Sequence, residues 1–362
     1  MPNFQTGVVS EISESREGLS RLKVTVGEQT RDATNFTSLT GEVQVGDRVV
    51  LNTTAVDLNL GTGGQDFVLW NLERDSQKTS SGGHIMKMRY APGQMDVLAA
   101  EAPESEHHET LLTAASLGGM PVVACGLHSQ VAPAAAMLKL LDPDIRIAYV
   151  MTDGGSLPIA HSNLVHMLKE KGLIDVTVTA GHAFGGDYES VNMFSGLVIA
   201  GEVAGADITI VAMGPGVTGT GTTLGHSAME QGQVISATSA LGGRAVAALR
   251  ISFADPRPRH RGLSQHTLSA LRFGAQARCT MAVPDLPVVE LTEVMESLTD
   301  SGLTEMHDVR IVDAWETIPA LEKAGLESTT SMNRSISEDP HFFEAAGAAG
   351  LYAGQLLYQT DD

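Results

Sequence analysis

The stretch PVVACGLHSQVAPAAAMLKLLDPDIRIAYVMTD (residues 121–153) decides the fold. It opens with a short apolar strand, PVVACGLH, and continues with an Ala- and Leu-rich segment that predicts a helix over 130–141. It closes with a second apolar strand, RIAYVMTD. Strands that are apolar on both faces and joined by helices are typical of a parallel sheet with helices on both sides. This stretch therefore predicts an α/β domain.

The same alternation continues toward the C-terminus, and each apolar strand precedes a segment that predicts a helix. The pairs are RIAYVMTD with 158–171, VTVTAG (176–181) with 188–204, ITIVAMG (208–214) with 222–240, AVAALRIS (245–252) with a helix from about Ser264, and VRIVDA (309–314) with WETIPALEKAG (315–325). Because parallel crossovers are right-handed, every strand-to-helix loop should lie at one edge of the sheet. We predict a mostly parallel, doubly wound domain over 81–362.

The N-terminal part has a different pattern, with five short β-branched runs between residues 6 and 72 and no helical period. This pattern predicts a small β-barrel module over 1–80, of the SH3 or OB type. The polar segment SQKTSSGG (76–83) is the expected boundary, and IMKMRYAPGQMDVLAAEA (85–102) predicts a hairpin. Residues 1–75 carry 6 basic and 11 acidic side chains. We therefore favour a packing or oligomerisation role for the barrel over nucleic-acid binding.

Composition narrows the setting and the partners. The net charge of −20 disfavours binding to nucleic acids and to anionic membranes. No apolar run reaches the roughly 18 residues of a membrane span, and the N-terminus lacks the features of a signal peptide. Cys125 and Cys279 are the only cysteines, which fits a reducing compartment. We expect a cytoplasmic protein. The small-residue segment FFEAAGAAGLYAGQLL (342–357) predicts a helix suited to a domain or subunit interface, and hence a homo-oligomer.

Polar, Gly-rich segments follow the predicted strands, where ligands of open α/β sheets bind. The five segments are 125–129, 152–156, 181–187, 214–223 and 254–262. We predict that they form one polar pocket, although loops of α/β domains are commonly polar for structural reasons alone. Ser129 and Cys125 are weak candidates for a nucleophile, because neither belongs to a known motif.

The run GPGVTGTGTTLGHS (214–227) carries the most information about a ligand. Gly214, Gly216 and Gly219 match G-x-G-x-x-G between a strand and a predicted helix, where backbone amides bind phosphate. Thr220 and Thr222 could add hydroxyl donors. The acidic residue that dinucleotide sites place about 20 residues on is missing, and no Lys precedes Thr222. The run therefore predicts that this loop binds an anion, and it leaves the cofactor unknown. The alternative is that the glycines only form a tight turn.

The segment DPRPRHRG (255–262) places three arginines within five positions, and arginine binds carboxylate and phosphate through paired hydrogen bonds. Arg257 and Arg261 are therefore candidate ligands of an anionic substrate. The alternative is that these arginines form salt bridges with neighbouring acidic loops.

Several histidines also fall in or just after the strand-end segments, as do three aspartates: His128, His182, His226, His260 and His266, with Asp153, Asp187 and Asp255. Histidine transfers protons near neutral pH, and a carboxylate can orient it. We take His128, His182, His260, Asp153 and Asp187 as candidate catalytic residues and His266 as a candidate ligand-binding residue. No spacing is a metal signature, so we predict no metal site. Each histidine could instead have a structural role.

Several strings together resemble a bacterial family that is catalogued only as domain of unknown function 3866. They include HIMKMRY, AYVMTDGGSLP, TAGHAFGGD, GPGVTGTGT and ADPRPRHRGLSQHTLSAL. The resemblance spans nearly the whole chain, barrel included. It implies a bacterial, cytoplasmic protein but no reaction, substrate, cofactor or catalytic residue.

The leading hypothesis from the sequence is an enzyme, a hydrolase or group transferase, that acts on a small anionic metabolite. The first alternative is a non-catalytic sensor that binds a nucleotide or metabolite in the same pocket. The second is a structural scaffold. A catalytic site requires a histidine within hydrogen-bond reach of a carboxylate beside the anion site, whereas a sensor requires only the anion donors.

Overall fold

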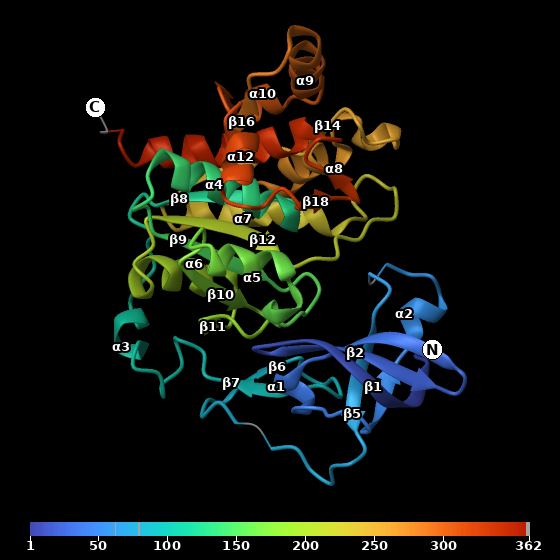
Figure 1. Ribbon diagram of the computed structural model, residues 1–362. Coiled ribbons are helices and arrows are strands. Elements are labelled where there is room, and N and C mark those ends of the chain that lie inside the picture. The colour runs from blue at the N-terminus through green and yellow to red at the C-terminus, as the bar shows by residue number, and fades with distance from the viewer. Residues whose placement is uncertain (62, 79, 360–362) are drawn as a thin grey trace. The chain divides into compact units, whose positions relative to one another are not determined.

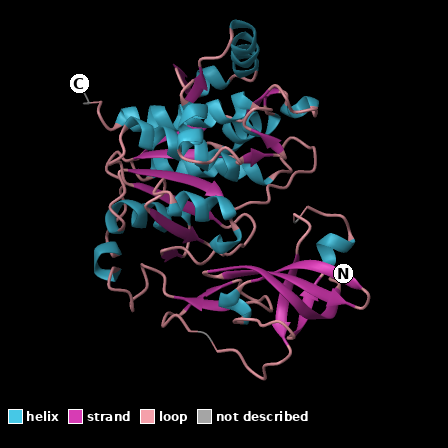
Figure 2. Cartoon of the chain, viewed as in Figure 1, coloured by secondary structure: helices cyan, strands magenta, loops and turns pink. Residues whose placement is uncertain are grey.

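The computed structural model describes residues 1–61, 63–78 and 80–359. The chain divides into two compact units, Met1–Leu98 and Ala99–Asp362 (Figure 1). The first unit is built mainly of strands, and the second alternates strands with helices (Figure 2). The predicted fold class, a small barrel followed by a parallel α/β domain, is confirmed. Among the residues described, no helix combines the length and the apolarity needed to cross a membrane.

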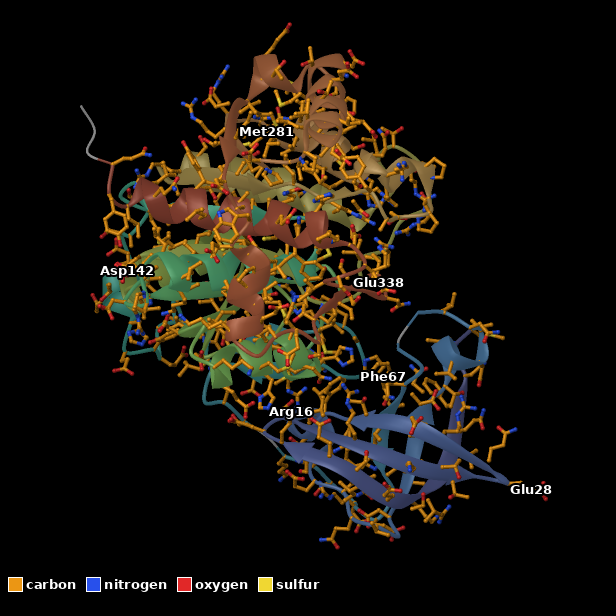
Figure 3. All side chains as sticks on the ribbon, turned by 45° about the horizontal axis from the view of Figure 1, so that its top comes forward. Arg16, Glu28, Phe67, Asp142, Met281 and Glu338 are labelled. Atoms are coloured by element: carbon orange, nitrogen blue, oxygen red, sulfur yellow. The ribbon has the colours of Figure 1, made fainter. Side chains whose placement is uncertain are left out.

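Five strands close into the barrel in the order β1-β2-β3-β5-β4. They are β1 (Phe4–Arg16), β2 (Leu19–Val26), β3 (Gln29–Asn35), β4 (Arg48–Asn52) and β5 (Asp66–Asn71). Their alternating apolar side chains, among them Leu22, Val24 and Leu51, fill the interior. The barrel thus has a core of its own, and Glu28 lies in the turn between β2 and β3 (Figure 3).

Four short elements complete the first unit besides the barrel strands. Helices α1 (Thr37–Thr40) and α2 (Thr54–Asp57) lie between barrel strands, and β6 (Ile85–Lys87) pairs with β7 (Met95–Val97). The hairpin predicted over 85–102 therefore forms. It groups with the barrel rather than with the α/β unit, because the division falls after Leu98.

The second unit is built on an eight-stranded parallel sheet in the order β11-β10-β9-β12-β8-β13-β16-β17. The strands are β8 (Pro121–Cys125), β9 (Ile147–Thr152), β10 (Val176–Ala180), β11 (Tyr188–Ser190), β12 (Ile208–Met213), β13 (Arg244–Ala248), β16 (Thr280–Pro284) and β17 (Asp308–Val312). Their central members are apolar on both faces, as the sequence predicted. Met281 of β16, labelled in Figure 3, has no exposed surface.

Helices cover both faces of this sheet and create two cores. Val123 and Cys125 of β8 belong to one core and Val122 and Ala124 to the other. The first face carries α4 (Val131–Leu141), α5 (Asn163–Glu170), α11 (Thr317–Lys323) and α12 (Pro340–Leu356). The second carries α6 (Met193–Val198), α7 (Glu230–Ala240), α8 (Gln265–Ser269) and α9 (Val288–Asp300). The connections after β8 and β12, which are neighbours in the sheet, thus lead to opposite faces.

Three predicted elements differ from the structure. Residues 188–190 form β11 beside β10, so the helix predicted over 188–204 starts only at Met193. The helix predicted over 222–240 starts at Glu230. The run AVAALRIS breaks into β13 and β14 (Ile251–Ser252), and β14 turns away to pair with β15 (Gly262–Leu263). Strand β16 and helix α9 were missed. The remaining short elements are α3 (His108–Leu111), α10 (Leu303–Met306), β18 (Thr330–Ser331) and β19 (Arg334–Ser335).

Helix α12 packs inside its own unit, against α4 and the sheet. Its small residues allow this close approach, because a Cβ on Gly350 would lie 2.3 Å from the carbonyl oxygen of Ala134. The interface predicted from FFEAAGAAGLYAGQLL is therefore a contact within the unit. The helix gives no separate reason to expect a homo-oligomer.

Replacing Gly350 with Ala should destabilise the protein by about 1–3 kcal/mol, because the added methyl group overpacks the α4–α12 contact. Urea unfolding monitored by circular dichroism would measure this loss. Gly201→Ala is the matched control, since a Cβ there meets its nearest neighbour, the Cε of Met120, at an ordinary 3.7 Å. Equal stability of the two variants would contradict the packing described for α12.

Candidate functional site

Two buried glutamines organise the carboxyl edge of the sheet. Gln130, just before α4, donates from its side chain to the carbonyls of Ala248 (3.3 Å) and Leu249 (3.0 Å). Gln231, in the first turn of α7, donates to the carbonyls of Ala248 and Ala124, both at 2.8 Å. The starts of two helices on opposite faces are thereby tied to the ends of β8 and β13. This leaves the loops between them at one edge of the sheet.

The loops after neighbouring strands contact one another along this edge. The backbone amide of His182, after β10, donates to the carboxylate of Asp153, after β9 (3.1 Å). Nδ1 of His128, after β8, lies 3.2 Å from the carbonyl oxygen of Met213 at the end of β12. The segments after β8, β9, β10 and β12 therefore lie together, as the right-handed crossovers predicted.

A pocket of about 450 Å³ opens at the ends of β8 and β12. We call it the carboxyl-edge pocket. It is lined by residues 127–129, 163, 164, 167, 215–217 and 328–332. Its volume lies in the range of sites that hold small molecules. Hydroxyl groups are frequent in its wall, and His128 is the ionisable side chain among the lining residues.

His128 is held by three groups, from two strands and a helix cap. Nδ1 lies near the Met213 carbonyl and, at 3.1 Å, the Tyr149 hydroxyl, whereas Nε2 lies 2.7 Å from Oγ of Ser162. A carbonyl can only accept, so Nδ1 donates and Nε2 accepts from the Ser162 hydroxyl. Burial lowers the pKa of His128 to about 4. His128 is therefore neutral at pH 7, with both ring nitrogens bonded.

Further hydroxyl groups line the carboxyl-edge pocket. Oγ of Ser129 lies 3.0 Å from Oγ of Ser331. Thr329 is only 5% exposed, and its Oγ1 has no hydrogen-bond partner. Leaving a buried hydroxyl unbonded costs free energy, on the order of 1–3 kcal/mol. Asn163 and Leu164, in the first turn of α5, also line the pocket and present the positive end of the helix dipole.

A second group of candidate residues gathers beyond the end of β13. The rings of His226 and His266 stack with centroids 3.9 Å apart, and His260 meets His266 edge-on at 4.5 Å. We call these three residues the histidine cluster. All are at most 7% exposed, and Nδ1 of both His226 and His266 lacks a hydrogen-bond partner.

Burial lowers the pKa of His260 to about 3 and the pKa of His266 to about 4. The positive charge of nearby Arg250 lowers both pKa values further. The lone pairs of two parallel stacked rings cannot converge on one ion. Within the described part of the chain, no group of three or more His, Cys, Asp or Glu side chains could hold a metal.

The predicted anion-binding arginines bond to the protein itself. Arg257 donates to both carboxylate oxygens of Asp255, at 2.9 Å from Nε and 2.7 Å from an Nη atom. Arg250 and Arg334 reach the same carboxylate at 3.2 and 3.1 Å. These contacts hold the pKa of Asp255 far below its usual range despite its burial. Arg261 is exposed and donates to the carbonyl of Phe253. The salt-bridge alternative for DPRPRHRG therefore describes Arg257 correctly.

The Gly/Thr run does not form the phosphate loop that its motif indicated, because no helix starts there. The loop turns back on itself: the amide of Thr220 donates to the carbonyl of Gly225, and the Thr220 and Thr222 hydroxyls lie 2.9 Å apart. Gly214 is buried, whereas a Cβ on Gly219 would lie 3.1 Å from the ring of His266. Of the fingerprint residues, only Gly216 lines the carboxyl-edge pocket.

Asp187 does not belong to the carboxyl edge. It precedes β11 and lies beside Thr177 near the amino end of β10, where its carboxylate accepts from the Thr177 amide (2.8 Å) and pairs with Lys169. Asp187 therefore lies apart from the candidate residues at the carboxyl edge. Asp153 stays at the edge. A Cβ on Gly154 would lie 3.4 Å from the Glu230 carboxylate, and burial raises the pKa of Glu230, with Asp153 contributing.

Sequence reasoning missed several residues of these two groups. Thr329 and Ser162 lie in segments without a motif, and Arg334 lies far along the chain from Asp255. Arg250 was hidden because AVAALRIS was interpreted as one strand. The short spacing from Asp255 to Arg257 was the one available signal that this arginine is paired.

Comparison with known proteins gives a family but no activity. The family model described as "Protein of unknown function (DUF3866)" matches residues 32–350. No curated protein matches the chain.

Acid should destabilise the fold through its buried histidines. Unfolded histidines protonate near pH 6.5, whereas His128, His260 and His266 resist protonation down to about pH 3–4. Between these values the unfolded state binds more protons, so the free energy of unfolding falls as pH falls, by at most about 1.4 kcal/mol per pH unit for each histidine.

Urea unfolding between pH 7 and 4.5 would measure this slope. It should be shallower in His266→Gln than in His166→Gln, the control at a histidine whose side chain is 43% exposed. A slope that the His266 variant leaves unchanged would contradict a neutral, buried His266.

Proposed function

The chain belongs to the DUF3866 family of proteins of unknown function, and we propose that it binds a small anionic metabolite in the carboxyl-edge pocket without transforming it. The observation that carries this proposal is Thr329. Thr329 lines a pocket of about 450 Å³ and is only 5% exposed. Its hydroxyl nevertheless has no hydrogen-bond partner. A ligand oxygen would offset the cost of that unbonded group after a small rotation of the side chain.

The charge of the pocket favours an anion over a cation. Its described lining contains no carboxylate, although the protein as a whole carries a net charge of −20. The first turn of α5, with Asn163 and Leu164 in the pocket wall, contributes the positive end of a helix dipole. Hydroxyls of Ser129 and Thr329 can donate to carboxylate or phosphate oxygens.

The bonding of the histidines favours binding over catalysis. Within the described part of the chain, the hydrogen bonds of His128 and of the histidine cluster go to hydroxyls, carbonyls and an arginine, and none goes to a carboxylate. The hydroxyl of Ser162 lies 2.7 Å from Nε2 of His128, as in a nucleophile–base pair. However, Ser162 is 3% exposed and its oxygen caps α5 by accepting from the Val165 amide. A structural role explains both contacts.

The proposed setting is the cytoplasm of a bacterium. Cys125 and Cys279 are both free and buried, and burial raises the pKa of the Cys279 thiol to about 12. Unoxidised thiols fit a reducing compartment. The proposal assigns no nucleic-acid or membrane partner.

Calorimetric titration with inorganic phosphate and with succinate tests the proposal. At least one of these anions should bind the wild-type protein, and Thr329→Val, which removes the hydroxyl but keeps the side-chain shape, should weaken binding about fivefold to tenfold. This loss, about 1–1.4 kcal/mol, corresponds to one ordinary hydrogen bond.

Thr299→Val is the matched control, because its hydroxyl lies on the exposed side of α9 and bonds within the helix. Glycerol serves as the uncharged probe and should not bind. The proposal would be overturned if neither anion binds the wild-type protein, or if Thr329→Val and Thr299→Val bind the anion with equal affinity.

A further inference from the structure

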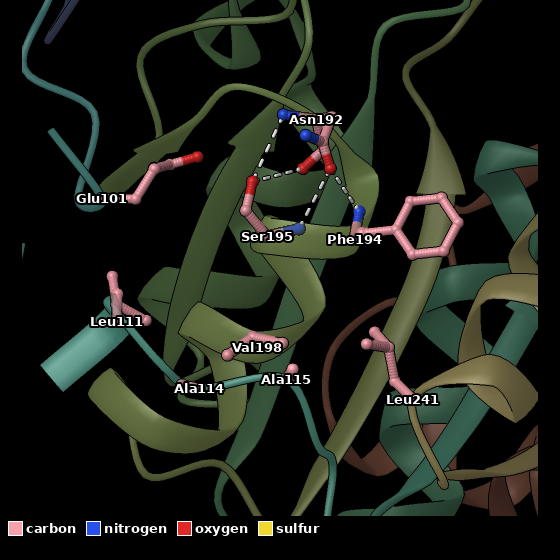
Figure 4. A pocket seen from close by; sticks show the side chains of 9 residues that line it. All are labelled: Glu101, Leu111, Ala114, Ala115, Asn192, Phe194, Ser195, Val198 and Leu241. Atoms are coloured by element: carbon pink, nitrogen blue, oxygen red, sulfur yellow. Dashed lines mark hydrogen bonds between the residues drawn. The ribbon is translucent and has the colours of Figure 1, made fainter.

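We propose that a second pocket of the α/β unit binds a small organic cation, an ammonium group on a short hydrocarbon body, with Glu101 as its counter-ion. This pocket has a volume of about 300 Å³ and lies between α3, α6 and the end of α7 (Figure 4). It shares no lining residue with the carboxyl-edge pocket. The inference is therefore independent of the function proposed above.

The walls of this second pocket are mostly apolar. Leu111 belongs to α3, and Phe194 and Val198 belong to α6. Leu241 directly follows α7. Phe194 is 48% exposed, so an aromatic ring lies within reach of an entering cation. Such surfaces favour the hydrocarbon part of a ligand, and an aromatic face adds to the attraction of a cation.

Glu101 supplies the charge at one end of the pocket. Its Oε1 accepts a hydrogen bond from the amide of Val191 (2.8 Å), and its backbone carbonyl lies 2.8 Å from Nδ1 of His108. These two contacts fix the residue between β11 and α3. Its second carboxylate oxygen, Oε2, is buried and has no hydrogen-bond partner. Figure 4 shows the Glu101 carboxyl group directed toward Asn192 and Ser195.

The groups opposite Glu101 do not satisfy that oxygen and do not offer an anion site. The side chain of Asn192 accepts from the amides of Phe194 and Ser195, so the first turn of α6 is already capped. The Ser195 hydroxyl donates to the carbonyl of Asn192. Among the described lining residues Glu101 is the ionisable one.

A buried carboxylate oxygen without a donor is costly. An ammonium group would supply both the donor and the opposite charge. A small movement of the Glu101 side chain would bring Oε2 to the pocket surface.

Titration calorimetry of the full-length protein with butylammonium chloride tests this inference, in 150 mM NaCl to screen binding to the acidic surface. The wild-type protein should bind butylammonium, and it should bind 1-butanol, which has the same length without the charge, at least tenfold more weakly. Glu101→Gln should weaken butylammonium binding at least tenfold. Glu109→Gln, which removes an exposed carboxylate from α3, should leave the affinity unchanged.

A second variant guards against misfolding of Glu101→Gln. Ala115→Leu adds apolar volume in the wall of the pocket and should also weaken butylammonium binding at least tenfold, while its urea unfolding midpoint stays close to that of the wild type. No binding of butylammonium by the wild-type protein, equal affinity for butanol, or wild-type affinity in Glu101→Gln would each overturn the inference.

Discussion

The carbonyl oxygen of Ala248, at the end of β13, accepts hydrogen bonds from both Gln130 and Gln231, and the arrangement of the carboxyl edge depends on this junction. A parallel sheet buried on both faces leaves carbonyls at its strand ends that need donors. The two glutamines supply them from the starts of α4 and α7, which lie on opposite faces. The chain can then leave neighbouring strands in opposite directions, and a pocket forms where the connections diverge.

The fold was largely predictable from the sequence because it follows from local patterns. Apolar runs separated by helical segments predicted the parallel sheet, and Ser264 was correctly placed at the start of α8. The pocket lining was predictable only in part: His128, Ser129 and Gly216 line it, but Thr329 and Ser331 come from a distant segment without a motif. Gly219 and Thr220 match a phosphate loop, yet the helix starts ten residues later, at Glu230. Arg257 matched an anion ligand, but Asp255 binds it.

The carboxyl-edge pocket and the pocket beside Glu101 differ in charge and therefore in the ligands proposed for them. One is lined by hydroxyls and the first turn of a helix, and the other by apolar side chains and Glu101. The histidines add little charge at neutral pH, because burial lowers the pKa of His128 and His266 to about 4. His128 and the histidine cluster act as neutral, close-packed groups that join loops.

A crystal structure of the protein grown with sulfate tests the central claim most directly. Sulfate has the charge and the acceptor oxygens of the proposed ligand class. The account predicts an ion in the carboxyl-edge pocket, with an oxygen within hydrogen-bond distance of Oγ1 of Thr329 and close to the first turn of α5. A sulfate ion bound only by exposed arginines such as Arg261, with the pocket closed and the Thr329 hydroxyl bonded to the protein, would contradict it.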